Sequence, residues 1–136
     1  MPTILTESEL LHYFPSFPEK FKTRLREFLA GKNVVLTEDE FNFATASVSQ
    51  FTQEVLRVTA KIPFGETMTY LQLANALGKP KAVRAVASAL GRNPLPFVIP
   101  CHRVTATNGI GGFAFGVPLK MKLLVFEKER RQLNSR

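Results

Sequence analysis

The sequence predicts a mainly α-helical protein with a helix-turn-helix in its larger, C-terminal part. From Phe51 onward, apolar residues recur mostly at the three- and four-residue spacing of amphipathic helices. Two of these segments are short and are joined by a tight turn that contains glycine, as in a helix-turn-helix. A length of 136 residues suits one domain with a small addition. We therefore expect a shortened N-terminal appendage, residues 1–46, and a helix-turn-helix domain, residues 47–136.

The appendage is predicted to contain one helix, Pro18–Ala30, which ends at Gly31, a favourable C-terminal cap. Four apolar residues recur along it at helical spacing: Phe21, Leu25, Phe28 and Leu29. The apolar run at residues 33–36 is too short to form an independent sheet. We expect this region to pack against the rest of the protein.

Two helices are predicted at the start of the larger part. The first, Phe51–Val58, ends near the turn at Ile62–Gly65. The second, Tyr70–Leu77, follows Thr69, whose hydroxyl can cap its first turn, and Gly78 closes it. This second helix is the first member of the predicted helix-turn-helix.

The other member is the segment Lys81–Leu90, preceded by Pro80, a residue suited to a first helical position. Its predicted buried stripe is Val83, Val86, Ala87 and Leu90. The positions left outward are Lys81, Ala82, Arg84, Ala85, Ser88 and Ala89. Small residues there would let a DNA duplex approach the backbone closely, with Arg84 projecting from the face. The alternative is that the alanines only raise helix propensity; we prefer DNA docking.

Charge supports a polyanionic partner. The chain carries a formal net charge of +7, and from Arg57 to Lys122 nine basic residues face one acidic residue, Glu66. A charge run is often only a solvated face, but a field of one sign attracts nucleic acid. No segment is long and apolar enough to span a membrane, and no secretory signal is evident, so we expect a cytoplasmic protein without membrane contact.

The single cysteine, Cys101, lies between Pro100 and His102. A lone thiol is either a small core residue or a reactive thiolate, and base rates favour the core. His102 reverses that preference, because an adjacent imidazole can serve as the base that a thiol nucleophile needs. Three prolines stiffen the preceding connector, where Asn93 can satisfy stray backbone groups or act as an ordinary turn residue.

After the cysteine, a glycine-rich loop at residues 108–116 can bend over a ligand, and its phenylalanines offer an apolar wall. A last helix then begins near Val117, and in it Met121, Leu124 and Glu127 share a face. If Glu127 is buried it needs a partner, for which His102 and Arg103 are the candidates; otherwise it is a solvated helix residue. One cysteine and two distant histidines (His12 and His102) predict no metal site, and no cofactor is expected.

Several motifs, in order along the chain, together resemble those of the O6-alkylguanine-DNA alkyltransferases over about residues 50–130. They are Tyr70, the run Lys81–Val86, Asn93-Pro94, the run Pro100–Val104, and Glu127. The resemblance implies a winged-helix-like domain that binds the minor groove and flips the damaged guanine from the duplex. It further implies that the alkyl group passes irreversibly to a cysteine, without a cofactor, in a monomeric protein used once. The implied partner is duplex DNA that contains O6-alkylguanine, which implies a nucleoid or nuclear location when bound.

The resemblance also implies a role for each matching residue. Cys101 would accept the alkyl group, His102 would act as general base through a bound water, and Glu127 would fix the tautomer of His102. Asn93 would hold the active-site turns together, and Tyr70 would contact the flipped nucleotide and supply a proton to the leaving guanine. Arg84 would fill the vacated stack. The other DNA-contacting positions would be Tyr70, Lys81, Ala82, Ala85, Ser88 and Thr107.

Two departures from the family pattern stand out. The implied substrate pocket comprises Val104, Phe113, Ala114 and Phe115, where the family usually has a tyrosine and a serine in the loop. We therefore expect an altered rate or substrate range. The N-terminal region is also short, and it lacks the zinc-binding cysteines that some members carry.

Other readings of the same residues remain. A non-catalytic DNA-lesion sensor or regulatory module would share the helix-turn-helix, but such relatives lack the cysteine. A thiol hydrolase would also use a Cys–His pair, yet the sequence gives no separate signal for an oxyanion hole. A purely structural DNA-binding protein would leave Cys101 inert.

Overall fold

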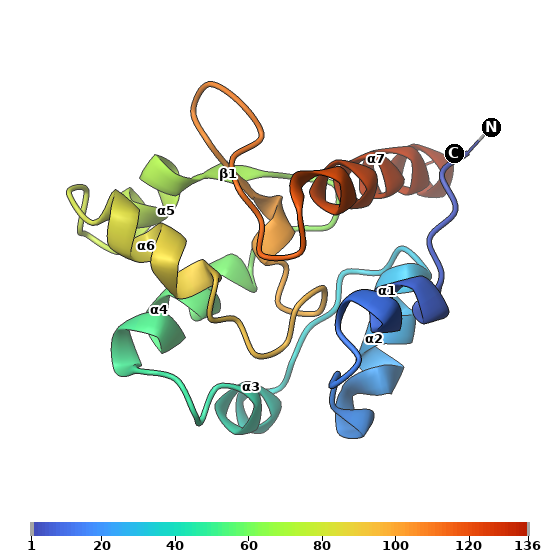
Figure 1. Cartoon of the computed structure of the whole chain (residues 1–136), viewed down its shortest axis with the longest axis horizontal. Coiled ribbons are helices and arrows are strands. Elements are labelled where there is room, and N and C mark those ends of the chain that lie inside the picture. The colour runs from blue at the N-terminus through green and yellow to red at the C-terminus, as the bar shows by residue number, and fades with distance from the viewer. Residues whose placement is uncertain (1, 136) are drawn as a thin grey trace.

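Helices dominate the structure, a computed structural model that describes residues 2–135, and so confirm the predicted fold class (Figure 1). The α-helices are α1 Glu7–Tyr13, α2 Lys22–Leu29, α3 Glu38–Ala44, α4 Gln50–Thr59, α5 Tyr70–Ala76, α6 Val83–Leu90 and α7 Val117–Asn134. Single 3-10 turns form at Glu19–Phe21 (η1) and Cys101–Arg103 (η2). Two short strands, β1 Met68–Thr69 and β2 Val104–Thr105, pair in parallel, with Met68 opposite Val104 and Thr69 opposite Thr105.

Side-chain caps fix where several helices begin. Thr69 accepts a hydrogen bond from the Gln72 amide, which confirms the predicted cap of α5, and the Gln72 side chain in turn accepts one from the Thr69 amide, which completes a capping box. The same reciprocal pair, Thr37 and Glu40, starts α3, and Thr6 caps α1. Neither α1 nor α3 was predicted, although the residues that cap both helices are visible in the sequence.

The helix-turn-helix forms as predicted, with α5 and α6 beside each other and both packed on α4 (Figure 1). Helix α6 begins at Val83, two residues later than predicted. Its predicted stripe was partly wrong, because Ala89 is buried and Ala87 is exposed. The two alanines flank opposite sides of the apolar stripe, and packing against α4 and α5 covers the side that carries Ala89.

One continuous cluster of buried side chains joins the N-terminal segment to the rest of the protein. Phe28 of α2 packs against Phe64 and Phe126, with ring centroids 5.9 Å apart in both cases. In Figure 1, α1 and α2 lie on one side with α7, and α5 and α6 lie on the other. The division near residue 46 stays a prediction, since the core extends across it.

Helix α7 presents an unexpected face to this core. Its buried residues are Leu119, Lys120, Leu123, Phe126 and Glu127. The prediction that Glu127 shares a face with Met121 was wrong, because Met121 is 53% exposed; the helix is rotated so that Leu123 faces inward.

Among residues 2–135, no helix has the length and apolar character needed to cross a bilayer.

Two glycines that follow the helices of the pair differ in backbone conformation, so replacing each by alanine should affect stability differently. Gly78, after α5, has φ +69°, whereas Gly91, after α6, has φ −66°. A side chain at Gly78 meets no atom within 4 Å, so only the left-handed conformation opposes it. We expect Gly78→Ala to lower the free energy of unfolding by about 1 kcal/mol. Gly91→Ala, the matched control, should raise it by about 0.5 kcal/mol. Urea denaturation measures both, and equal effects would contradict this account.

Candidate active site

Cys101 lies at the start of η2, buried at the end of the stiff connector. The Asn93 side chain fixes that connector: its Nδ2 donates to the Ile99 carbonyl at 2.7 Å, and its Oδ1 accepts from the Leu95 amide at 2.9 Å. Asn93 also acts to lower the pKa of the Cys101 thiol. The predicted linking role of Asn93 therefore has a geometric basis, because one amide joins two backbone groups of the turn that leads to Cys101.

His102, directly after the cysteine, is fully buried and bonds through Nε2 to Glu127. The Glu127 carboxylate also accepts from Arg103 Nε at 2.8 Å and from the Gly65 amide at 2.9 Å. Arg103 is held in turn by the Ile62 carbonyl at 2.7 Å. Glu127 thus has both of the partners considered for it, so the alternative of a solvated residue is wrong.

Burial governs the ionisation of this cluster. It raises the pKa of the Cys101 thiol, an effect that Asn93, Lys120 and nearby backbone amides oppose. Burial also lowers the pKa of His102, against the attraction of Glu127. For Glu127, burial acts to raise the pKa, but His102 and Arg103 outweigh it and the net pKa is lowered. The resting cluster is therefore a neutral thiol and a neutral imidazole beside an ionised carboxylate.

The free nitrogen of His102 completes this arrangement. Within residues 2–135, His102 Nδ1 is a buried side-chain atom without a hydrogen-bond partner. Because Nε2 is engaged by Glu127, the tautomer with hydrogen on Nε2 leaves a lone pair on Nδ1. That lone pair can accept a proton, and Glu127 would stabilise the imidazolium that results.

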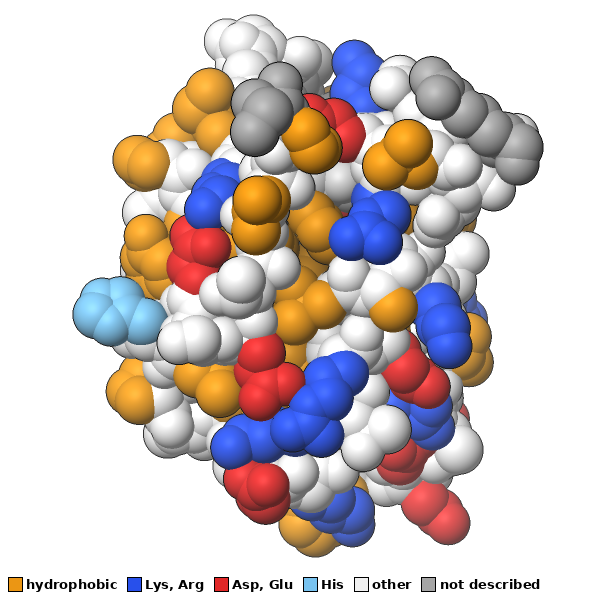
Figure 2. Space-filling view, turned by 90° about the vertical axis from the view of Figure 1, so that its right-hand side faces the viewer, with side chains coloured by type: hydrophobic (Ala, Val, Ile, Leu, Met, Phe, Trp, Pro, Cys, Tyr) orange, Lys and Arg blue, Asp and Glu red, His pale blue; other side chains and the backbone are white. Residues whose placement is uncertain are grey.

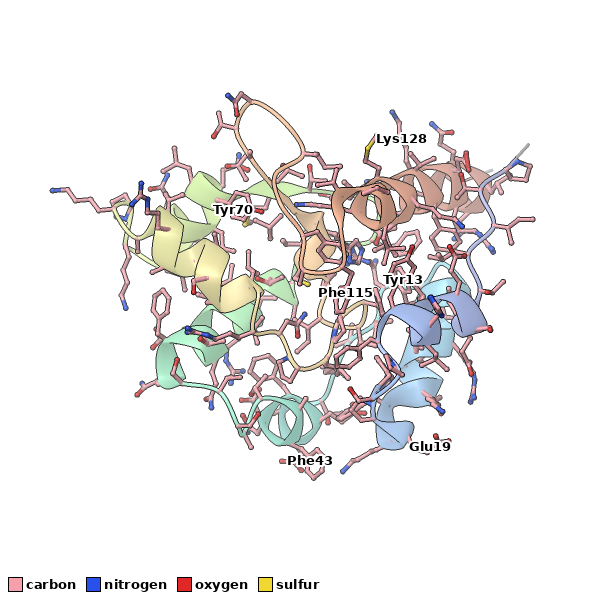
Figure 3. The ribbon with its side chains drawn as sticks, viewed as in Figure 1. Tyr13, Glu19, Phe43, Tyr70, Phe115 and Lys128 are labelled. Atoms are coloured by element: carbon pink, nitrogen blue, oxygen red, sulfur yellow. The ribbon has the colours of Figure 1, made fainter. Side chains whose placement is uncertain are left out.

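A pocket of about 400 Å³ opens beside Cys101. Its lining includes Asn93, Pro96, Cys101 and, from the loop before α7, Gly112 to Phe115, with Tyr70 and part of α6 opposite. Tyr70 is labelled in Figure 3; its hydroxyl donates to the Gly112 carbonyl at 3.4 Å, and burial raises its pKa. Three of the four predicted pocket residues line this space. Val104 does not: its side chain is fully buried in the core, on the strand β2 that pairs with β1.

The predicted DNA-facing residues gather on the exposed side of α6 and the turn before it. Arg84, Ala85 and Ser88 are exposed there, as is Lys81 in the turn, and Ala82 is half-buried. Ala89, one of the positions placed outward on this face, is buried, and Ala87 takes its place on the exposed side. Thr107 is exposed but lies in the loop after β2, which projects separately in Figure 1.

The basic field is smaller than the sequence count indicates. Of the nine basic residues, Arg103 and Lys120 are buried, and three pair with acids outside the segment: Arg57 with Glu38, Lys79 with Glu54 and Lys122 with Glu9. The other four are exposed and form no ion pair within residues 2–135: Lys61, Lys81, Arg84 and Arg92. Figure 2, by contrast, shows a face on which acidic and basic side chains alternate closely. Three of these four, Lys81, Arg84 and Arg92, lie on α6 or within two residues of its ends.

Comparison with known proteins identifies this arrangement. Residues 50–129 match the family model described as "6-O-methylguanine DNA methyltransferase, DNA binding domain". The chain belongs to this methyltransferase family. The match covers α4 to most of α7, and so includes the helix pair, Cys101 and Glu127. The predicted family, whose activity is methyl transfer from DNA to a protein cysteine, is confirmed.

Relatives of this methyltransferase family resemble the chain over different shares of their own length. A probable methylated-DNA–protein-cysteine methyltransferase of Acanthamoeba polyphaga mimivirus is 42% identical over 79% of the chain and 70% of its own length. The Escherichia coli bifunctional transcriptional activator/DNA repair enzyme Ada is 41% identical over 92% of the chain, but over only 37% of its own length. The crystal structure of Mycobacterium tuberculosis OGT in complex with DNA superimposes with a TM-score of 0.67, at 34% identity over 80% of the chain and 66% of that protein.

Lys120 lies beside this pocket and was not among the predicted site residues. It is fully buried on α7, and its Nζ donates to the carbonyls of Val104 at 2.6 Å and Gly112 at 2.9 Å. It thereby ties β2 and the middle of the loop before α7 to that helix. Its spacing of seven residues from Glu127 places both on one helix face, which was the available signal.

Lys120 also predicts a pH dependence of stability. Burial lowers its pKa from 10.5 to about 8. Between these pH values the unfolded chain retains the proton that the folded chain has released, so rising pH favours the folded state. The free energy of unfolding of the natural protein should therefore rise, relative to that of Lys120→Met, as the pH goes from 8 to 10.5. Urea denaturation of both proteins across this range measures the difference, and parallel pH profiles would exclude a lowered pKa.

Proposed function

We propose that this protein repairs duplex DNA by accepting the alkyl group of O6-alkylguanine on Cys101. The observation that carries the proposal is the placement of the only cysteine on the wall of an apolar pocket, next to a buried His102–Glu127 pair. A core cysteine has no need of such neighbours. The family match supports the reaction class, and the roles of individual residues are our inference.

The reaction begins with ionisation of the thiol. The Cys101 proton passes to His102 Nδ1 through one bridging water, and the carboxylate of Glu127 stabilises the imidazolium. The Asn93 amide and the adjacent backbone N–H groups stabilise the thiolate that forms. Burial disfavours both the Cys101 thiolate and the His102 imidazolium. The proton transfer between them therefore depends on stabilisation by Asn93, the backbone amides and Glu127.

The thiolate then attacks the alkyl carbon. A carbon–sulfur bond forms as the carbon–O6 bond breaks, and the electron pair of that bond stays with the guanine. Tyr70, on the pocket wall, supplies the proton that the leaving guanine takes up. The imidazolium of His102 then returns its proton through solvent to the Tyr70 phenolate, so both side chains end neutral and no cofactor is needed. The thioether has no route back to a thiol, so each molecule acts once.

Access to the base requires it to leave the duplex. The alkylated oxygen cannot reach a buried sulfur inside stacked DNA, so the nucleotide must be flipped into the pocket. Helix α6 offers small exposed residues for close approach to the minor groove, and Arg84 projects from them to occupy the gap in the stack. We propose that a monomer suffices, because the pocket and this face lie on one chain.

Replacement of Cys101 tests the acceptor. After incubation with a duplex that contains O6-methylguanine, the natural protein should gain the mass of one methyl group, located on Cys101 by peptide mapping. Cys101→Ser should gain none and still bind the duplex, because only the nucleophile is lost. An undamaged duplex serves as the control. If the natural protein binds the damaged duplex without any change of mass, it is a lesion-binding or regulatory protein instead.

Replacement of Arg84 tests the flipping role. Arg84→Ala should slow methyl transfer from a duplex by about tenfold or more, because the gap left by the flipped base is no longer filled. Transfer from a single strand with the same lesion should change little. Arg92→Ala, which removes another exposed cation near α6, is the matched control and should affect the duplex less. Single-turnover kinetics give these rates; equal losses on both substrates would rule out the flipping role.

A further inference from the structure

Phe115 links the substrate pocket to a part of the chain far away in sequence. Its ring lines the pocket and contacts three other aromatic rings: Phe113 at 5.4 Å between centroids, Phe14 at 5.8 Å and Phe97 at 5.9 Å. Figure 3 labels Phe115 near the centre of the molecule, between the loop before α7 and α1. The contact with Phe14 is edge-to-face, a favourable geometry for two phenyl rings.

Phe14 is itself fixed in place, although it does not line the pocket. It ends α1, where its amide donates to the Leu10 carbonyl at 3.0 Å. Its own carbonyl accepts from the amide of Phe17, a buried residue whose ring packs edge-to-face on Phe14. Phe14 thus forms a rigid support behind Phe115, supplied by the N-terminal segment.

Phe97, on another side of Phe115, belongs to the turn that leads to Cys101. It has φ +72°, an unfavourable conformation for a residue with a side chain, and its ring is buried. Its neighbour Pro96 lines the pocket together with Cys101 and Phe115. During transfer the alkyl carbon lies against the Cys101 sulfur, so any group attached to that carbon extends along this wall.

We propose that Phe14 is a positioning residue that holds Phe115 against the pocket and so restricts the acceptor site to small O6-alkyl groups such as methyl. The inference rests on the proposed function. If Phe14 is lost, the edge-to-face contact disappears and the Phe115 ring gains room to turn away from the wall beside Cys101. A bulky group, for which benzyl is the probe, then fits better, whereas a methyl group, which does not reach Phe115, gains little.

The experiment compares single-turnover rates on two duplexes that differ only in carrying O6-methylguanine or O6-benzylguanine. The natural protein should prefer methyl. Phe115→Ala should raise the benzyl-to-methyl rate ratio by about tenfold or more, and Phe14→Ala should raise it by about threefold to tenfold. In the double variant the ratio should equal that of Phe115→Ala alone, because Phe14 acts only through Phe115.

Three further variants separate positioning from folding. Phe14→Tyr keeps the ring and should keep the natural ratio, and Phe14→Leu preserves apolar volume should the alanine variant fail to fold. Tyr13→Ala removes the adjacent, 40% exposed ring, whose one aromatic contact among residues 2–135 is with His12, and should leave the ratio unchanged. Thermal unfolding of each variant shows whether it is folded.

The possible outcomes distinguish failure of the positioning role from failure of the proposed function. An unchanged ratio in both Phe14→Ala and Phe14→Leu, an additive double variant, or a natural protein that takes benzyl as fast as methyl would overturn the positioning role while methyl transfer still stands. Absence of transfer from either duplex would overturn the proposed function, and this inference with it.

Discussion

The buried carboxylate of Glu127 is the constraint on which the rest of the structure depends. An ionised carboxylate in a protein interior is tolerated only with several hydrogen-bond donors, and this one has three: His102, Arg103 and the Gly65 amide. These donors come from η2 and from the turn after α4, whereas Glu127 belongs to α7. A single charge therefore holds together three parts of the protein: α7, the turn η2 that carries Cys101, and the turn between α4 and β1.

The aromatic core makes this constraint effective. Phe28, from α2, packs edge-on against the His102 ring with centroids 5.7 Å apart, and also covers Phe64 and Phe126. By excluding water it strengthens the attraction between His102 and Glu127 and penalises any unpaired charge. Residues of the short N-terminal segment thus contribute to the site electrostatically through Phe28 and sterically through Phe14. The N-terminal segment therefore contacts residues of the candidate site directly, in addition to covering the core.

The sequence predicted those features that are encoded locally. The caps at Thr69 and Gly78, the adjacency of Cys101 and His102, and the family motifs all lie in short runs. Features that depend on contacts between distant residues were missed. Burial of Lys120 requires two carbonyls of a loop that folds back on α7, and burial of Ala89 rather than Ala87 depends on which helices α6 packs against. Similarly, nothing near Phe115 indicates that Phe14, a hundred residues away, supports it.

The two-residue strand pair has a consequence for how the chain can vary in length. Thr69 is opposite Thr105 in the ladder, and each strand directly adjoins a site element: β1 precedes Tyr70, and β2 follows the turn that carries Cys101. A slip of one residue would shift Tyr70 by about 3.3 Å relative to the thiol, far beyond what a reacting geometry tolerates. Insertions and deletions are therefore barred from Thr69 to Tyr70 and from Cys101 to Thr105. The exposed loop tip at Thr107 and Asn108 lies outside this ladder and is closed only by the isolated bridge between Ala106 and Gly109, so it is where natural length variation can accumulate.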